Sequence, residues 1–218
     1  MVVKKFLQFK NLLLIIIMIR KFDFSNNLVI ASHNQGKVRE FKDLFKDMSI
    51  SVLSASEFNL KEPVESGKSF KENAVIKAVY TSKLVGEISI SDDSGLSIKA
   101  LNGAPGIYSA RWAGRKNDFA IAMKKINDEL LLKESKDNSA KFTCALCLAW
   151  PDGYFQCFEG VINGKIVWPP RGKKGFGYDP IFIPNGLTKT FGEIDPDLKH
   201  KLSHRAIAFN KLLKKCFN

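Results

Sequence analysis

The sequence lacks a long apolar segment, a disulfide framework and any internal repeat. Its apolar run from Leu12 to Ile19 has eight residues, whereas a membrane-spanning helix needs about 20. Four cysteines in 218 residues are too few for a disulfide scaffold. Cys144-Ala-Leu-Cys147 fits the C-x-x-C pattern, but no second pair follows at zinc spacing. We therefore expect buried, reduced thiols in a cytoplasmic protein without membrane attachment.

Acidic residues are scarce relative to basic ones. The chain has 34 Lys and Arg against 22 Asp and Glu, a formal net charge of +12 at pH 7. Such a charge attracts polyanions, namely nucleotide phosphates, nucleic acid or anionic lipid, although a lysine-rich solvated surface explains most of it. Part of the excess lies in residues 1–24. We expect this basic, apolar extension to be dispensable, with Met18 as an alternative start, and residues 25–218 to form one domain.

Hydrophobic periodicity predicts an α/β fold. Residues 27–48 show a short apolar strand, a polar turn and a helix, the opening of an α/β unit. Ser69 followed by Glu72 has the spacing of a capping box and predicts a second helix. Residues 141–162 predict two strands joined by a Pro-Asp-Gly turn. Helix-linked strands together with a hairpin indicate a mixed central sheet with flanking helices.

The turn between the first strand and helix contains groups that bind anions. It consists of Ser32, His33, Asn34, Gln35, Gly36 and Lys37. Free N–H groups and the positive end of the helix dipole favour an anion there, and Lys37 adds a positive charge. A capping role for Ser32 and Asn34 is the alternative. The glycine and lysine spacing of a Walker loop is absent.

Two neighbouring carboxylates, Asp92 and Asp93, are predicted to end a strand. Adjacent carboxylates repel each other unless a cation or hydrogen-bond donors offset their charge. A divalent ion bound by carboxylate oxygens would do so. Glu65 is the further candidate ligand, because capping already explains Glu72. Aspartates that merely form a turn or cap a helix are the alternative.

A glycine-rich segment offers surfaces for a flat ligand. Gly175 and Gly177 flank Phe176, which lets the backbone approach a ligand closely. Phe176 and Tyr178 provide aromatic faces, and Asp179 provides an acceptor for a ring N–H. A glycine-rich surface loop with ordinary core aromatics is the alternative.

Basic side chains gather at the predicted start of the last helix. Ser203 is its expected N-cap, with His204 and Arg205 in the first turn and Lys199 just before it. Three potential cations at this point indicate an anion or a carbonyl-bearing ring as ligand, although a single histidine is often structural. Together, the four segments suggest a magnesium-dependent enzyme that acts on a nucleotide.

Three motifs in this order closely resemble those of the inosine/xanthosine triphosphate pyrophosphatases, the Ham1-like family: "SDDSGL...ALNGAPGIYSARWAG", "GFGYDPIFIP" and "SHRAIAF". The resemblance extends from about Leu28 to Leu213. It implies an elongated α/β fold with a long mixed sheet and two lobes around a nucleotide-binding cleft. It also implies a homodimer that uses Mg²⁺ to hydrolyse ITP, dITP or XTP to the monophosphate and pyrophosphate.

The resemblance gives each candidate residue a role. Asp93 becomes the general base and, together with Glu65, a ligand of one Mg²⁺ ion per subunit. The other candidates become nucleotide contacts: Ser32–Lys37 for the triphosphate, with Asn34 and Lys37 foremost; Ser94; Phe176, Gly177, Tyr178 and Asp179 for the base; and Lys199, His204 and Arg205 for purine carbonyls or phosphate.

Two other functions fit the same composition and segments. A broader triphosphatase would accept other modified nucleotides. A basic nucleic-acid-binding module would account for the net charge, but the chain has no recognisable reader motif, and we expect no requirement for nucleic acid.

Overall fold

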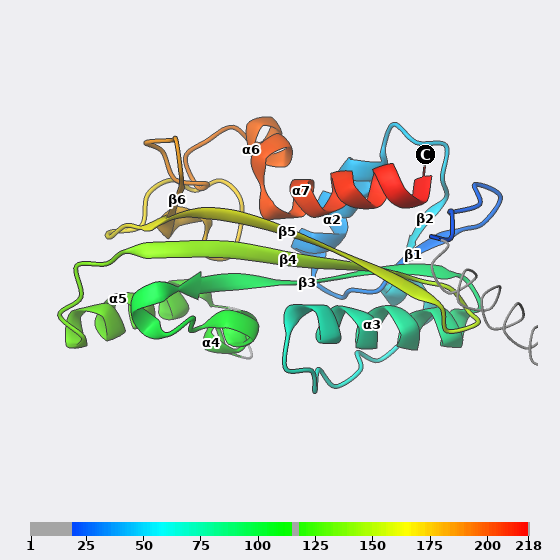
Figure 1. The fold of residues 1–218 in the computed structure, drawn as a ribbon, viewed down its shortest axis with the longest axis horizontal. Coiled ribbons are helices and arrows are strands. Elements are labelled where there is room, and N and C mark those ends of the chain that lie inside the picture. Colours follow the sequence, from blue (N-terminus) through cyan, green and yellow to red (C-terminus); the bar gives the residue numbers. More distant parts are fainter. Residues whose placement is uncertain (1–18, 115–117, 218) are drawn as a thin grey trace, which may run out of the picture.

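In the computed structural model, residues 19–114 and 118–217 are described (Figure 1). They contain one six-stranded sheet in the order β2-β1-β3-β4-β5-β6. β1 pairs in parallel with β2 and β3, and the remaining pairs are antiparallel. This confirms the predicted mixed sheet. The strands are β1 (Leu28–Ile30), β2 (Val52–Ser54), β3 (Ile88–Ile98), β4 (Ser139–Ala149), β5 (Phe155–Ile166) and β6 (Phe182–Pro184).

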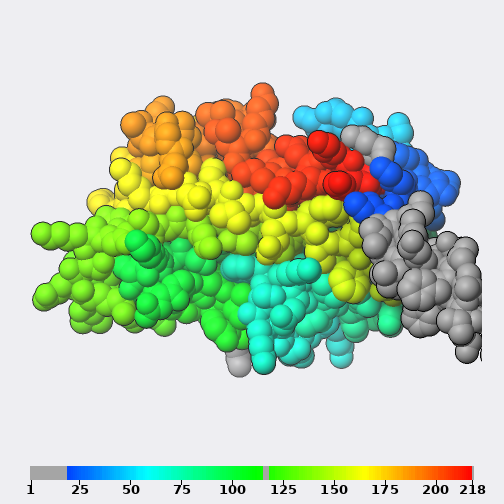
Figure 2. Space-filling view, viewed as in Figure 1, coloured from blue at the N-terminus to red at the C-terminus, as the bar shows by residue number. Residues whose placement is uncertain are grey.

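Helices cover both faces of the sheet (Figure 1). One face carries α2 (Gln35–Phe45), α6 (Pro196–Leu202) and α7 (His204–Leu212), and the other carries α3 (Phe70–Val85), α4 (Ser109–Trp112) and α5 (Phe119–Leu132). The body is elongated along its long strands, as Figures 1 and 2 show. Among the described residues, no helix combines the length and apolarity that a membrane span requires.

Side-chain caps fix where the helices begin. The Ser69 hydroxyl accepts a hydrogen bond from the Glu72 backbone N–H at 3.1 Å, as predicted. The Glu72 carboxylate accepts from the backbone N–H of Lys68 instead of Ser69. Ser203 caps α7 through the N–H of Ala206. The sequence reading missed α6, although an aspartate cap followed by proline precedes it.

The prediction that a strand ends at the two aspartates is wrong, because β3 continues through them to Ile98. Pairing with β4 along residues 89–98 satisfies its backbone groups over this length. Successive side chains of a strand point to opposite faces. Ser91 bonds to the Ala74 carbonyl of α3, so Asp93 lies on the α3 side. Asp92 lies on the opposite side, which α2 and α7 cover.

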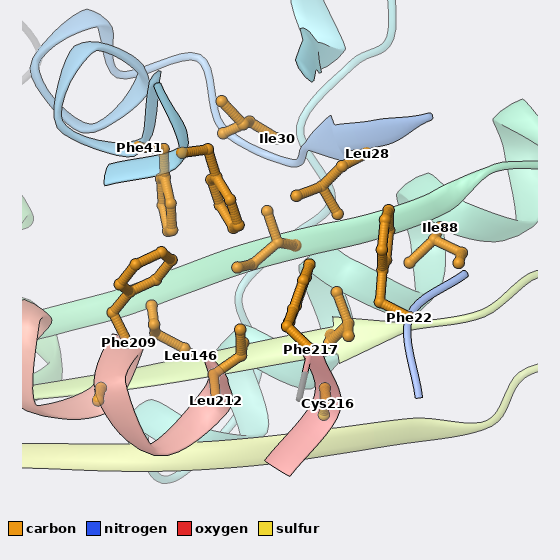
Figure 3. Close-up of a cluster of buried hydrophobic side chains, with 14 of the residues drawn as sticks. Phe22, Leu28, Ile30, Phe41, Ile88, Leu146, Phe209, Leu212, Cys216 and Phe217 are labelled. Carbon is orange, nitrogen blue, oxygen red and sulfur yellow. The ribbon is translucent and has the colours of Figure 1, made fainter. Parts of the chain in front are cut away.

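Two hydrophobic clusters lie at different positions along the strands of the sheet. The first packs β1, β3 and β4 against α2 and α7 (Figure 3); it includes Leu28, Ile30, Phe41, Leu146, Phe209 and Leu212. The second packs the far parts of β3 and β4 against α5 and β6; it includes Leu96, Ile98, Ile126, Phe142, Ile181 and Phe182. Phe22, from the expected extension, also belongs to the first cluster and stacks on Phe217. Residues 1–18 of that extension lie outside the described residues.

The two cysteines of the C-x-x-C motif pack on opposite faces of the sheet. Cys144 belongs to the first cluster, whereas Cys147 packs with alanines of α3 and β4. Both are fully buried and free. The prediction that the thiols of this motif are buried is therefore confirmed.

Glycine at position 160 lets α7 pack closely on β5. A Cβ atom there would collide with the carbonyl oxygen of His204 and lie 2.5 Å from the backbone nitrogen of Ala208. We expect Gly160→Ala to displace α7 and to lower the free energy of unfolding by about 1–3 kcal/mol, the usual cost of overpacking. Urea denaturation would measure this loss, and unchanged stability would contradict the close approach.

Candidate active site

A cavity of about 330 Å³ opens where β1 ends. β1 pairs with β3 only along residues 88–90, so the later part of β3 has no strand on this side. Groups from both faces of the sheet can therefore meet at one opening, outside the carboxyl ends of parallel strands. Gln35 and Gly36 are the predicted site residues that do not line it. Its lining includes the others: Ser32, His33, Asn34, Lys37, Glu65, Asp93, Ser94, Phe176, Gly177, Tyr178, Asp179, Lys199, His204 and Arg205.

The turn before α2 differs from the predicted anion cradle. The side-chain oxygen of Asn34 accepts hydrogen bonds from the backbone N–H groups of Gly36 and Lys37, at 2.9 and 3.2 Å. These N–H groups are therefore used in capping, as the alternative interpretation held, and are not free for an anion. The positive charge of Lys37 remains at the cavity wall, where its ammonium pairs with Asp92.

His33 connects this turn to the segment that precedes Glu65. Its Nε2 lies 2.8 Å from the carbonyl oxygen of Leu60. Its Nδ1 lies 3.2 Å from the Glu62 carboxylate, which also accepts from the His33 backbone N–H. The side chain therefore helps to place the loop that leads to Glu65.

Asp92 is a buried anchor for cations of the protein. It is 1% exposed and accepts hydrogen bonds from Arg205 Nε at 3.1 Å and Nη2 at 2.8 Å. Lys37 and the thiol of Cys144 also bond to it. Burial opposes the charge of Asp92, but Arg205 and Lys37 outweigh it and hold the carboxyl pKa well below its usual value. The charge of Asp92 is thus balanced by protein cations, without a divalent ion.

Asp93 meets a different set of groups on the α3 side. Asn73 donates to its Oδ2 and Lys77 to its Oδ1, both at 3.2 Å. The same Lys77 ammonium donates to Glu65 Oε1 at 2.6 Å. Burial raises the pKa of Asp93, while Lys77 and Lys37 partly oppose that rise. Burial works against the charge of Lys77, but Asp93 and Glu65 raise its pKa overall.

Glu65 and Asp93 have the chemistry of a magnesium site. Within the described ranges, no group of three or more His, Cys, Asp or Glu side chains lies in position to hold a metal ion. Mg²⁺, however, takes one or two protein carboxylates and completes its shell with water and substrate phosphates. The two carboxylates already share one cation, the Lys77 ammonium, at the cavity wall. The donor set therefore fits the ion.

The three potential cations predicted near α7 are engaged within the protein or uncharged. Lys199 donates to Asp179 at 2.6 Å and to Glu40 at 3.2 Å. Arg205 pairs with Glu40 as well as Asp92. His204 is 5% exposed and stacks on Phe142. Burial, reinforced by Arg205 and Lys199, lowers its pKa well below the usual value, so the imidazole is uncharged.

The aromatic segment forms another wall of the cavity. Phe176 lies under the Lys199 ammonium, 4.8 Å from its ring centroid. Asp179 accepts from the Phe176 backbone N–H at 2.8 Å as well as from Lys199, so it is engaged within the protein. Burial raises the pKa of Asp179, although Lys199 offsets part of the rise. Gly175 has φ +72°, and a Cβ there would collide with Asp179.

The sequence reading missed three residues that complete these contacts. Asn73 and Lys77 stand four positions apart on α3 and face Asp93 together. Glu40 on α2 joins the two basic side chains near α7. Asn73 and Lys77 could have been found from the sequence, because they are polar residues four positions apart on a helix with a predicted cap. Glu40 lies in an ordinary amphipathic helix pattern, which gives no such signal.

The fold and cavity define an α/β protein with a polar ligand site at the open edge of its sheet, where carboxylates and cations from both faces meet. The chain belongs to the Ham1 family, whose model matches residues 28–215. This confirms the resemblance inferred from the motifs.

Individual relatives cover most of the chain. It is 50% identical to the dITP/XTP pyrophosphatase of Zymomonas mobilis over 87% of this chain and 91% of that protein. It is 48% identical to the dITP/XTP pyrophosphatase of Agrobacterium fabrum, over 90% and 98%. Among solved structures, a HAM1 protein from Coxiella burnetii has a TM-score of 0.80 at 38% identity, over 87% of this chain and 97% of that one.

Proposed function

We propose that this protein hydrolyses dITP, XTP and ITP to the nucleoside monophosphate and pyrophosphate, and so keeps deaminated purines out of DNA and RNA. The observation that carries the proposal is that Asp93 and Glu65 share the ammonium of Lys77 at the wall of a cavity that Lys37 also lines. The names of the relatives agree with it. The proposal includes a cytoplasmic homodimer and no requirement for nucleic acid.

In this proposal Asp93 accepts the proton of the attacking water. A carboxylate whose pKa is raised by burial is a better proton acceptor than an exposed one. Lys37 and Lys77 place positive charge where the phosphate oxygens gain negative charge during cleavage. Mg²⁺ held by Glu65 and Asp93 would supply further charge stabilisation for the phosphates.

Selection of the base is proposed to depend on Lys199. Its ammonium has three N–H donors, and in the described part of the chain Asp179 and Glu40 accept two of them. The third can face a 6-oxo group of hypoxanthine or xanthine. Adenine presents a 6-amino donor at that position, so two donors would face each other. An unpaired buried donor costs about 1–3 kcal/mol, which corresponds to roughly ten- to hundredfold selectivity.

A substrate panel tests the proposed function. With Mg²⁺, we expect the protein to release pyrophosphate from dITP and XTP at least about tenfold faster than from ATP or GTP, as the unpaired-donor cost implies for ATP. Direct detection of pyrophosphate and chromatography of the monophosphate would identify the cleaved bond. The Asp93→Asn variant, purified in parallel, controls for contaminating phosphatases.

Each alternative function corresponds to a distinct result. Equal turnover of all purine triphosphates would contradict the proposed selectivity. Rapid cleavage of modified pyrimidine triphosphates would favour the broader triphosphatase. Salt-sensitive retention on single- or double-stranded DNA without turnover would favour a nucleic-acid-binding module.

A further inference from the structure

Two cysteines outside the catalytic cavity face each other across the central hairpin. Cys147 on β4 is directly opposite Cys157 on β5 in the antiparallel register. Both pack in a small cluster beneath α3, with Ala74 and Ala78. Both are free thiols, and neither lines the cavity that the proposed function uses.

Their positions meet the geometric requirement for a disulfide. Opposed residues of an antiparallel pair have Cα atoms about 4.5 or 5.5 Å apart, and disulfides span Cα separations of about 4.4–6.8 Å. The side chains also interact already. The interaction between the two thiols is the leading cause that raises the pKa of Cys147 and lowers the pKa of Cys157. The backbone separation of this pair therefore lies within the range that a disulfide spans.

The two thiols differ in solvent exposure, so they have different roles in the proposed reaction. Cys147 is fully buried, whereas Cys157 is partly exposed. β6 covers the outer edge of β5 only along residues 164–166, and much of β5 is visible at the surface in Figure 2, in yellow. The interaction with Cys147 is the main cause that lowers the pKa of Cys157; Lys71 adds to it, while burial and Glu159 oppose it. The partly exposed Cys157 is the more accessible to peroxide, and Cys147 lies opposite it, in position to react with its oxidised form.

The other two cysteines provide internal controls. The thiol of Cys144 donates to Asp92, and its pKa is raised by burial first and by that carboxylate next. Cys216 is buried, which raises its pKa to about 11. Both thiols are buried, whereas Cys157 is partly exposed, and neither has another cysteine opposite it in the described sheet.

We propose that Cys147 and Cys157 form a peroxide-oxidisable site that closes to a reversible disulfide. The Cys157 thiolate attacks one oxygen of hydrogen peroxide, the O–O bond breaks, and a sulfenic acid and hydroxide form. The sulfur of Cys147 then attacks the Cys157 sulfur, loses its proton and displaces hydroxide, which is released as water. The two thiols together lose two electrons and two protons, and one peroxide becomes two waters. An added thiol reductant restores both cysteines.

Oxidation of the full chain tests this site. The protein is treated with hydrogen peroxide, remaining thiols are alkylated, and the intact mass and peptic fragments are measured. We expect a loss of two hydrogen atoms per chain and a bond between Cys147 and Cys157, both reversed by dithiothreitol. Cys216→Ser should retain the loss. In Cys147→Ala, whose new side chain suits the alanine-lined site, the bond should be absent and dimedone should label Cys157.

Three results would overturn the proposal. The first is a disulfide that joins other cysteines. The second is an unchanged mass after peroxide treatment, with Cys157 alkylated to the same extent as in untreated protein. The third is dimedone labelling of Cys157 that is equal in the parent protein and in Cys147→Ala. Pyrophosphate release is not part of this readout, so failure here and failure of the proposed function remain separate results.

Discussion

Asp93→Asn should reduce kcat for dITP hydrolysis by about 10²–10⁴-fold, the range that a positioned general base contributes. The amide retains the shape of the carboxylate and an oxygen that can accept from Lys77, but it cannot take a proton from water. Asp93 is buried and directly bonded to Asn73 and Lys77, so its position is well defined. Steady-state kinetics at saturating Mg²⁺ would measure the loss, with circular dichroism to verify the fold.

Two further variants make this test specific. Asp152→Asn changes an exposed aspartate on the surface and should leave kcat unchanged. Glu65→Gln removes a proposed metal ligand but not the proposed base, so it should chiefly raise the Mg²⁺ concentration needed for half-maximal activity. If Asp93→Asn retained more than a tenth of the parental kcat at saturating Mg²⁺, Asp93 could not be the general base.

Local signals in the sequence predicted most of the fold because they act over a few residues. Ser69 ahead of α3 and Ser203 ahead of α7 cap their helices as expected. The Pro-Asp-Gly turn separates β4 from β5, which pair along residues 139–149 and 155–165. These features depend on neighbours in the chain, so one sequence was sufficient to find them.

The end of β3 could not be predicted from local signals. The stretch from Ser91 to Asp93 is polar, which is typical of a turn, yet it lies buried within a strand. Its burial depends on distant partners: Arg205, 113 positions away, neutralises Asp92. Lys77 comes from α3 and neutralises Asp93 on the opposite face. A reading of neighbouring residues has no access to these pairs.

The dependence on distant partners also explains why the positions of the site residues were easier to predict than their roles. The predicted residues other than Gln35 and Gly36 do line one cavity. Their individual tasks were harder to infer. Asn34 caps a helix, and Asp179 is bonded to Lys199. Glu40, which completes the pairing, reads as an ordinary polar position of α2.

Arg205→Met should destabilise the fold more than any other change considered, by about 3–5 kcal/mol, because removing one partner of a buried ion pair leaves the other charge poorly compensated, here with Lys37 alone beside Asp92. Arg205 is 3% exposed and binds both Asp92 and Glu40. Methionine retains the apolar part of the side chain but none of its donors. Urea denaturation would measure the free energy of unfolding, and a loss below about 1 kcal/mol, the usual range of an exposed pair, would contradict the structural role of this pairing.

Two further variants distinguish the loss of charge compensation from the loss of packing in Arg205→Met. Arg171→Met breaks a half-exposed ion pair with Glu193, at 3.6 Å, and should cost no more than about 1 kcal/mol. Adding Asp92→Asn to Arg205→Met removes a buried negative charge that Lys37 then balances alone, so the double variant should be more stable than Arg205→Met alone. If the second substitution gave no recovery, the loss would come from packing around Arg205. Recovery would establish that Arg205 permits an acidic side chain inside β3, next to the residue proposed to activate water.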